Sequence, residues 1–352
     1  VHMGATSQDI TDTAAMLLSR RALDLILTEV DGIADACARL AREHRATPMA
    51  GRTLLPQALP TTFGLKAAGW LVPVLEARRK LRQVRASGLA AQLGGAAGTL
   101  ASLGGSGPSV LREFALELGL PEPPLPWHTD RTRISTIAEA LSLLAGVLGK
   151  VSQDVVLMAQ TEVGEVAEPA GEGRGGSSTL PHKRNPILSV TAAANSRRVR
   201  DLTHTLGAAM VQEHERAAGA WHSEWEALSD ALALAGGAAA NVREATEGLE
   251  VHPERMRENL DRTGGMLLAE NVTTRASAGL GRLAAHDLVE AACRRALENG
   301  EHLRAELVRD ERIREALSEE EIDAALDPAG YLGSAGAFVD RALELYRAEE
   351  PS

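Results

Sequence analysis

Hydrophobic residues in this chain recur every three or four positions over long stretches, which is the period of an amphipathic α-helix. Residues 12–44 keep this spacing from Ala14 to Leu40, so they predict one helix of about nine turns. The same pattern predicts four further long helices, over residues 61–87, 132–165, 185–212 and 223–248. Long helices with broad apolar stripes bury those stripes against other helices, so the pattern indicates a helical bundle.

The pattern shortens after residue 250. Helices are expected over residues 253–261, 266–282, 285–299, 301–309 and 311–317, separated by Gly, His-Pro or polar breaks. Ser318, followed by three glutamates, predicts the N-cap of one more helix with an acidic first turn. We therefore expect two domains, a long-helix domain over residues 1–250 and a small helical domain over residues 251–352.

The stretches between these helices carry helix breakers. Residues 1–9 are polar and expected to be irregular, and residues 47–60 hold three prolines and a glycine, which predicts an ordered loop. Residues 88–107 are rich in Gly and Ala, and close packing of backbones is favoured there over a flexible linker. No convincing run alternates with period two, so sheet content should be close to nil. The predicted fold class is all-α.

Composition narrows the classes of function. The net charge of −11 argues against nucleic-acid binding as the main task, but it allows an anionic substrate where cations gather locally. No uninterrupted apolar stretch reaches the roughly 20 residues needed to cross a bilayer, and no secretory signal pattern opens the chain, so a soluble protein without membrane contact is expected. Cys37 and Cys293 lie on apolar helix faces, which predicts reduced core thiols and a cytoplasmic protein.

The densest chemistry lies in the loop at residues 175–186, which reads Gly-Gly-Ser-Ser-Thr-Leu-Pro-His-Lys-Arg-Asn-Pro. A serine is a weak base unless nearby cations or peptide N–H groups stabilise its alkoxide, and Lys183 is such a cation. A solvated Gly/Ser linker is the plain alternative, but linkers seldom place cations between prolines. Residues 171–186 thus predict a Gly-hinged catalytic loop.

Two other kinds of site find little support. A serine hydrolase would need a Gly-x-Ser-x-Gly elbow between a strand and a helix. The sequence contains no such motif and predicts no strand to precede it. The ten histidines show no two-turn ligand spacing with partner carboxylates, apart from Glu213, His214 and His222, which a helix would scatter around its surface. We therefore expect neither metal nor organic cofactor.

The loop resembles the signature of the fumarase/aspartase superfamily, which is Gly-Ser-Ser, two residues, Pro, one residue, Lys, one residue, Asn. Segments 2–9, 51–53, 61–64, 212–216 and 331–336 extend the resemblance toward the 3-carboxy-cis,cis-muconate cycloisomerase family. The resemblance implies that Ser177 removes a proton from a carbon next to a carboxylate. It also implies that Lys183 and Asn185 stabilise the resulting aci-carboxylate, with Ser178 hydrogen-bonding the same oxygens.

The resemblance also implies how a small tricarboxylate is bound. Candidate ligands of its carboxylates are Thr6, Ser7, Gln8, Arg52, Thr53 and Arg216, and His2 is a candidate acid/base or carboxylate partner. A surface ion pair is the plain alternative for each arginine. For His2 the plain alternative is no function. A homotetramer around a shared helical core is implied, with sites shared between subunits, and family members carry a further N-terminal helical region.

Two departures from the wider superfamily bear on the reaction. Leu54 and Val190 stand where fumarase and its eliminase relatives have a His and a Glu that pair with each other. An amine or hydroxide must be protonated as it leaves, but a carboxylate leaves unaided because its conjugate acid has a pKa near 4. This favours a cycloisomerase acting on 3-carboxy-cis,cis-muconate and its lactone. An adenylosuccinate-lyase-like eliminase and a catalytically silent scaffold are the alternatives.

Overall fold

The chain forms two compact units in the computed structural model, which describes residues 2–171, 175–176, 180 and 183–349. The first unit is built from segments Val1–Ala36, Val72–Val156 and Glu168–Leu249, and the second from Cys37–Leu71, Leu157–Ala167 and Glu250–Ser352. The chain passes from the first unit into the second for the last time at residue 250. The domain division at that residue stays a prediction, because each unit also takes up other segments.

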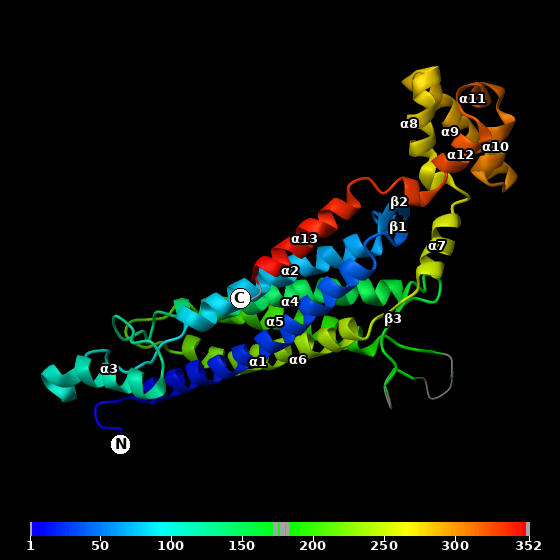
Figure 1. Ribbon diagram of the computed structural model, residues 1–352. Coiled ribbons are helices and arrows are strands. Elements are labelled where there is room, and N and C mark those ends of the chain that lie inside the picture. The colour runs from blue at the N-terminus through cyan, green and yellow to red at the C-terminus, as the bar shows by residue number, and fades with distance from the viewer. Residues whose placement is uncertain (1, 172–174, 177–179, 181–182, 350–352) are drawn as a thin grey trace. The chain divides into compact units, whose positions relative to one another are not determined.

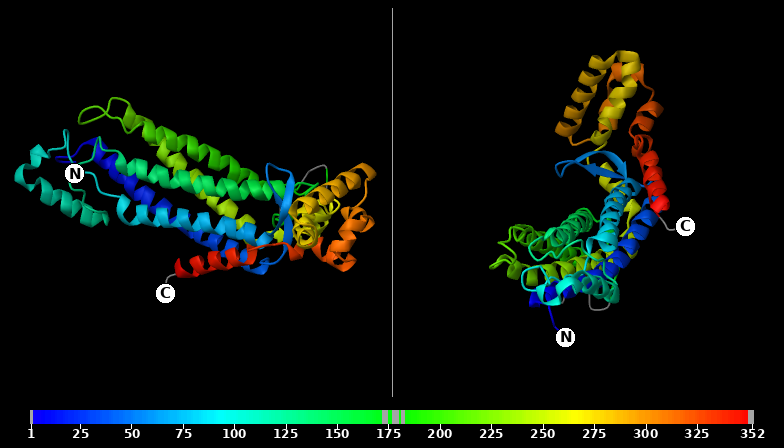
Figure 2. Two further views of the ribbon diagram at one scale, coloured as in Figure 1. Left: turned by 90° about the horizontal axis from the view of Figure 1, so that it is seen from above. Right: turned by 90° about the vertical axis from the view of Figure 1, so that its left-hand side faces the viewer.

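Long helices make up the first unit, as the sequence predicts. Figures 1 and 2 show α4, α5, α6 and the first part of α1 running side by side. The helices of this unit are α1 (Ser7–Glu43), whose end lies in the second unit, the later part of α2 (Phe63–Gln83), α3 (Gly107–Leu118), α4 (Thr132–Met158), α5 (Ile187–Ala208) and α6 (Ala220–Glu247). The predicted all-α fold is thereby confirmed.

Helix α1 starts five residues earlier than the spacing of hydrophobic residues predicts. Asp9 caps its first turn, since its carboxylate accepts a hydrogen bond of 2.9 Å from the Thr6 N–H. Helix α4 conversely ends before the predicted residue 165, at Met158. The chain then turns at Gly164, whose φ is +63°, and the Glu165 N–H returns to the Met158 carbonyl at 2.9 Å.

Helix α4 is a core helix of the first unit. Its residues Ile134, Ile137, Leu141 and Leu148 are at most 1% exposed. Among the described helices it is the one long and apolar enough to cross a membrane by length and composition, with a mean hydropathy of 1.5 over its most apolar window. Because 61% of that window is buried within the protein, the hydropathy is explained by packing.

The Gly/Ala-rich stretch after α2 is packed in the interior. Residues 89–95 are buried without regular secondary structure, and the Trp127 indole N–H donates to the Ala91 carbonyl at 2.8 Å. A Cβ atom on Gly94 would lie 2.6 Å from Pro126 and 2.7 Å from His128. Close backbone packing is therefore confirmed for residues 89–95, whereas most of residues 96–106 are exposed.

A β-hairpin in the second unit corrects the expectation of a loop at residues 47–60. Strand β1 (Pro48–Arg52) pairs antiparallel with β2 (Gln57–Thr62), with an irregularity between Ala50 and Arg52. The prolines are compatible with pairing because the sheet has two strands, both of them edges, where a missing N–H is tolerated. A second pairing of two residues joins β3 (Val166–Ala167) to β4 (Glu250–Val251).

Short helices complete the second unit. Those between residues 269 and 325 share a core that includes Val272, Val289, Leu307 and Ile322. The N-cap predicted at Ser318 is present and forms a capping box, because its hydroxyl accepts from the Glu321 N–H while the Glu321 carboxylate accepts from the Ser318 N–H. The helices are α7 (Pro253–Asp261), α8 (Ala269–Leu280), α9 (Arg282–Asn299), α10 (Leu303–Arg309), α11 (Glu311–Ala316), α12 (Glu319–Ala325) and α13 (Ala335–Glu349).

The two cysteines are free, as expected. Cys37 is buried in α1, where burial raises the pKa of its thiol to about 12. Cys293 in α9 is half-buried, and partial burial raises its pKa as well. Both thiols are therefore weak nucleophiles at neutral pH.

Candidate active-site segments

The ends of the signature loop are tied together at the start of α5. The N–H of Asn185 and its side-chain amide both donate to the Gly175 carbonyl, at 2.8 and 3.1 Å. Gly176 also forms an isolated antiparallel β-bridge with Arg184. Gly175 has a φ of +68°, and a Cβ there would lie 2.9 Å from the Asn185 carbonyl oxygen. Ser177 and Ser178, the predicted base and its neighbour, lie outside the described residues.

Glu168 anchors this loop to the helix behind it. Its buried carboxylate accepts hydrogen bonds from the N–H groups of Leu188 and Ser189, at 3.0 and 2.7 Å, in the first turn of α5. Its carbonyl accepts from the Arg184 guanidinium at 2.7 Å. A carboxylate at a helix N-terminus satisfies unpaired N–H groups and the positive end of the helix dipole. Glu168 thus fixes where the loop ends.

The predicted cation Lys183 is exposed in this structure. Its N–H donates to the Leu180 carbonyl at 3.0 Å, so the main chain turns just before it. Asn185, predicted beside it in the site, is partly buried and holds the base of the loop as described above. Whether these two residues stabilise a developing negative charge stays a prediction.

The N-terminal segment gathers around Arg216. The Arg216 guanidinium donates to the Thr6 hydroxyl at 2.7 Å and to the carbonyls of Gly95 and Ala96 at 3.3 and 3.1 Å. Two predicted carboxylate ligands from opposite parts of the sequence are therefore brought together. Ser7 and His2 are exposed, and His2 has a φ of +72°.

Gln8 lies inside the protein. It is 1% exposed, and its amide nitrogen donates to the Asp12 carboxylate at 3.1 Å and to the His128 carbonyl at 2.8 Å. Within the described residues its Oε1 atom has no hydrogen-bond partner. Its packing is that of a residue which holds α1 against the loop before α4.

Asp9 forms a buried pair with His128. One carboxylate oxygen lies 2.6 Å from His128 Nε2, and the N–H groups of Gly94 and Gly95 each donate to the carboxylate at 2.9 Å. Burial alone would raise the pKa of Asp9, but the hydrogen bonds from His128 and the backbone N–H groups lower it. The carboxylate is thus held ionised beside the segment that carries Thr6.

The buried Arg131 binds two acidic residues, one on α1 and one on α6. Arg131 donates to both oxygens of Asp12, at 2.8 and 3.0 Å, and to Glu224, with a shortest distance of 2.6 Å. Its guanidinium lies 5.0 Å from the centre of the Trp127 ring. Burial raises the pKa of Glu224, although its hydrogen bonds with Arg131 oppose that rise. Two acids share one buried cation here.

Arg52 lies in the second unit and is already paired. It donates to both carboxylate oxygens of Glu165, at 2.9 and 2.7 Å. The Thr53 N–H donates to the Pro56 carbonyl at 3.0 Å, which closes the hairpin turn. The turn itself carries Leu54 and Leu55, both in the left-handed region with φ of +53° and +82° and exposed by 98% and 78%.

Within the first unit, two groups of predicted site residues lie at opposite ends of α5. Lys183 and Asn185 precede its first residue, whereas Arg216, with Thr6 bound to it, follows its last. The 22 residues of α5 span about 33 Å, which no side chain bridges. Figure 1 shows this helix running along the bundle between the two places. One chain therefore does not bring these two groups together.

Sequence reasoning missed the carboxylates that hold these segments. Glu165 falls at the end of the helix expected over residues 132–165, whereas α4 ends at Met158, and Glu168 follows that helix outside any motif. Asp9 and Arg131 are charged residues among apolar neighbours, which is a signal, but their partners lie 85 to 119 positions away. No local pattern in the sequence pairs them.

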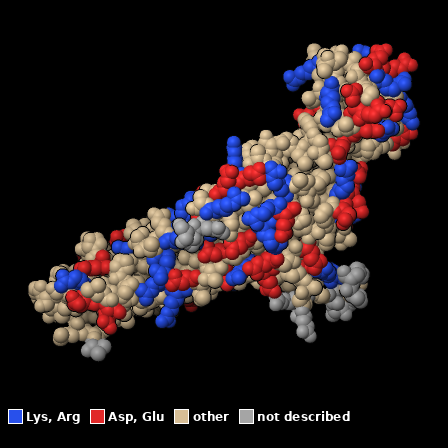
Figure 3. Space-filling view, in the orientation of Figure 1, with Lys and Arg blue, Asp and Glu red and all other residues tan. Residues whose placement is uncertain are grey.

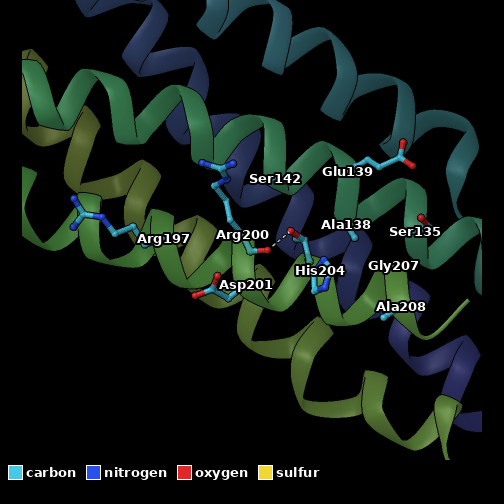
Figure 4. A pocket seen from close by; sticks show the side chains of 11 residues that line it. Ser135, Ala138, Glu139, Ser142, Arg197, Arg200, Asp201, His204, Gly207 and Ala208 are labelled. Carbon is cyan, nitrogen blue, oxygen red and sulfur yellow. Dashed lines mark hydrogen bonds between the residues drawn. The ribbon is translucent and has the colours of Figure 1, made fainter. Parts of the chain in front are cut away.

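An open groove of about 900 Å³ lies on the α4 and α5 face of the first unit. Ser135 and Glu139 on α4 line it together with Arg200 and His204 on α5, and Figure 4 shows the Arg200 side chain extending toward α4. None of the described motif residues lines this groove. Its open form and its place along two long helices suit a surface that other helices cover.

Charges on the molecular face in Figure 3 are mixed. Lys and Arg alternate with Asp and Glu over both units, and this face shows no continuous basic surface among the described residues. The one described group that could hold a metal ion is His286, Asp287 and Glu290, all exposed on α9. None of the three belongs to the motifs above, and exposed acidic groups of this kind are common without a metal.

Two protein families match the chain. Residues 1–200 match the family described as lyase, and residues 265–342 match the adenylosuccinate lyase C-terminus. The 3-carboxy-cis,cis-muconate cycloisomerase of Bradyrhizobium diazoefficiens is 48% identical over 98% of this chain and 76% of its own length. The nitrosuccinate lyase of Streptomyces davaonensis is 47% identical over 97% of this chain and 74% of its own.

A solved structure agrees with these relatives. The 3-carboxy-cis,cis-muconate lactonizing enzyme of Pseudomonas putida superimposes with a TM-score of 0.94 at 44% identity, over 99% of this chain and 77% of that one. Identity at this level over nearly the whole chain shows common descent as well as a common fold. This chain therefore belongs to the fumarase/aspartase superfamily of lyases, in the branch that contains the 3-carboxy-cis,cis-muconate cycloisomerases.

Proposed function

We propose that this protein is a cycloisomerase that interconverts 3-carboxy-cis,cis-muconate and γ-carboxymuconolactone. The observation that carries the proposal is the 48% identity to a cycloisomerase over 98% of the chain, together with a signature loop that keeps Ser177, Lys183 and Asn185. The intact loop also argues against a catalytically silent scaffold. The reaction is an intramolecular addition of a carboxylate to a conjugated double bond.

The absence of an acid pair supports this reaction class. Leu54 and Val190 replace the His and Glu of related eliminases, and their side chains are 98% and 46% exposed, so neither is needed to fill a core. When the lactone opens, the group that leaves carbon is a carboxylate, which requires no proton. An apolar surface at these two positions is sufficient for that step, whereas expulsion of an amine would be slow.

In the lactone-opening direction, the Ser177 oxygen takes the proton from the carbon next to a substrate carboxylate. The electron pair of that C–H bond forms the new double bond, and the ring C–O bond breaks to release the internal carboxylate. Lys183 and Asn185, with Ser178, donate to the substrate carboxylate as it gains charge. In the cyclising direction Ser177 returns the proton to the same carbon. No metal or organic cofactor enters either direction.

Several donors are proposed to bind the three carboxylates of the substrate. Thr6 and Arg216 form one pair already in contact, and Ser7 is exposed beside them. Arg52 with Thr53 forms a second set. His2 is exposed and can act as a carboxylate partner or as an acid/base group. Cations that fit a trianion are thus present although the whole chain is acidic.

We further propose that each site combines segments of different subunits in a homotetramer. The distance of about 33 Å along α5 supports this, because Thr6 and Lys183 cannot meet within one chain. The groove on α4 and α5 is a surface that other subunits can cover. Mixing a Thr6→Val variant with a Ser177→Ala variant should restore part of the activity, and no recovery in verified mixed tetramers would exclude shared sites.

The substrate is tested with purified protein in an ultraviolet assay. Cyclisation removes the conjugated diene, so absorbance of 3-carboxy-cis,cis-muconate should fall on addition of enzyme. Adenylosuccinate, fumarate and nitrosuccinate are run beside it, the last because a relative of nearly equal identity is named for it. Turnover of adenylosuccinate or nitrosuccinate with an inert muconate would overturn the proposal. The free thiols further support a cytoplasmic enzyme, and neither nucleic acid nor membrane is proposed as a partner.

A further inference from the structure

Arg52 is held by a carboxylate that lies entirely inside the protein. Its two terminal nitrogens donate to the two oxygens of Glu165, at 2.9 Å from Nη1 and 2.7 Å from Nη2. The Glu165 side chain is 0% exposed, whereas the Arg52 side chain is 25% exposed. The Arg52 guanidinium is thus bound on one side by a buried carboxylate and remains partly exposed to solvent.

Glu165 is itself fixed by its neighbours. The Asn259 amide donates to its carboxylate at 2.8 Å and to the Val163 carbonyl at the same distance. On the main chain, the Glu165 N–H donates to Met158 and the Glu165 carbonyl accepts from His252 at 3.0 Å. Because both the side chain and the main chain of Glu165 are hydrogen-bonded, its carboxylate has a fixed position to which Arg52 binds.

The partner strand of the hairpin is held by the same helix residue. Gln57 lies opposite Arg52 in the β1–β2 register, and its amide donates to the Asn259 carbonyl at 3.0 Å. The two strands are therefore held on either side of the turn that carries Leu54 and Leu55. The strained turn is built on a rigid base.

We propose that Glu165 is a positioning residue that fixes the plane of the Arg52 guanidinium for a substrate carboxylate. The inference rests on the proposed function, in which Arg52 is a substrate ligand. Contacts in the described part of the chain use three of the five N–H groups of Arg52, two to Glu165 and one to the Ala50 carbonyl at 3.4 Å. The other two would donate to a substrate carboxylate from a guanidinium that is already fixed, so little side-chain freedom would be lost on binding.

A double-mutant cycle separates this role from simple stabilisation. Glu165→Gln should lower kcat/KM about tenfold, mainly through KM, because the released arginine must be reoriented by each substrate. In an Arg52→Met background the same change should cost less than about twofold. Glu258→Gln, a matched change of an exposed carboxylate on α7, should leave both values unchanged. Equal losses with and without Arg52 would show a merely structural role and overturn the inference.

A second measurement does not depend on turnover. Phenylglyoxal modifies accessible arginines, and peptide mapping reports the rate at Arg52. That rate should rise severalfold in Glu165→Gln and also in Glu165→Asp, which keeps the charge but shortens the reach, while Glu258→Gln leaves it unchanged. An unchanged rate in both Glu165 variants would refute the inference. A wild-type protein that does not convert the muconate would refute the proposed function alone, since this rate would still decide the role of Glu165.

Discussion

The buried group of Asp12, Arg131 and Glu224 allows a quantitative prediction. Asp12 and Glu224 are 2% and 3% exposed, and Arg131 is also 2% exposed. Replacing Arg131 by Met keeps the volume nearly constant but leaves two carboxylates buried without a cation. Replacing Glu224 by Gln removes the surplus negative charge and leaves Arg131 paired with Asp12. The two changes delete opposite charges from one site.

The two variants should lose different amounts of stability, because Arg131→Met leaves buried carboxylates without a cation and Glu224→Gln does not. Removing the shared partner of buried ions costs about 3–5 kcal/mol, whereas weakening hydrogen bonds without stranding a charge costs about 1–2 kcal/mol. For a chain of this length the unfolding entropy corresponds to a Tm change of roughly 1.4 °C per kcal/mol. Arg131→Met should therefore lower Tm by about 4–7 °C, and Glu224→Gln by about 1–3 °C.

The pH dependence gives an independent sign. Burial is the main cause that raises the pKa of Glu224 above its ordinary 4.5, so the folded protein holds this proton more tightly than the unfolded chain does. The wild-type free energy of unfolding therefore falls as the pH rises from the ordinary pKa of Glu224 through its raised pKa in the folded protein. Glu224→Gln lacks this loss, so its Tm should improve relative to the wild type as the pH rises above about 4.5.

Thermal melts at fixed protein concentration measure both effects. Glu226→Gln, an exposed carboxylate on the same helix, is the control and should shift Tm little at any pH. If Glu224→Gln proves as destabilising as Arg131→Met, stranded charge is not the dominant cost. If the difference between Glu224→Gln and the wild type does not change with pH, the burial argument for Glu224 is wrong.

Three further outcomes are expected. Glu168→Gln should lower Tm and also kcat, because the carboxylate that caps α5 and holds the end of the signature loop loses its charge, a loss of about 0.5–2 kcal/mol in the free energy of unfolding. An unchanged kcat would show that this cap does not position the loop for catalysis. Asp9→Asn should weaken the protein above about pH 4 and become harmless in stronger acid, since the lowered pKa of Asp9 gives stability that is lost as the pH falls through it; melts from pH 6 to 3 check this. Leu54→His combined with Val190→Glu should not speed cycloisomerisation, because a carboxylate leaving group gains nothing from an acid, and a faster double variant in the muconate assay would contradict that reading.

Much of the fold could be predicted because helix periodicity is a local property. The five long helices follow directly from apolar spacing, and the N-cap at Ser318 follows from four consecutive residues. The β1–β2 hairpin could not be predicted, since its prolines are acceptable only on the edges of a two-stranded sheet. Helix α13 was not predicted from the sequence. Its contact from Asp340 to Arg45 joins residues 295 positions apart.

The candidate site divides in the same way. The residue types that carry the chemistry, such as Lys183 and Arg216, stand in short motifs and were found. The residues that hold them do not, because Glu165 and Asn259 acquire meaning only when α7 is packed beside the hairpin. Sequence therefore identified candidate reacting groups, and tertiary structure was needed to find what positions them.

The most direct test of the proposed chemistry is the turnover and binding of a Ser177→Ala variant, with Lys183→Met as its comparison. If Ser177 carries the proton, the Ala variant should still bind the anionic lactone while its turnover falls by orders of magnitude. Lys183→Met should weaken both, because its charge is felt in the bound state and more strongly as the aci-carboxylate develops. Near-normal turnover by Ser177→Ala would contradict the account, and would assign the base to another group, with His2 the first candidate.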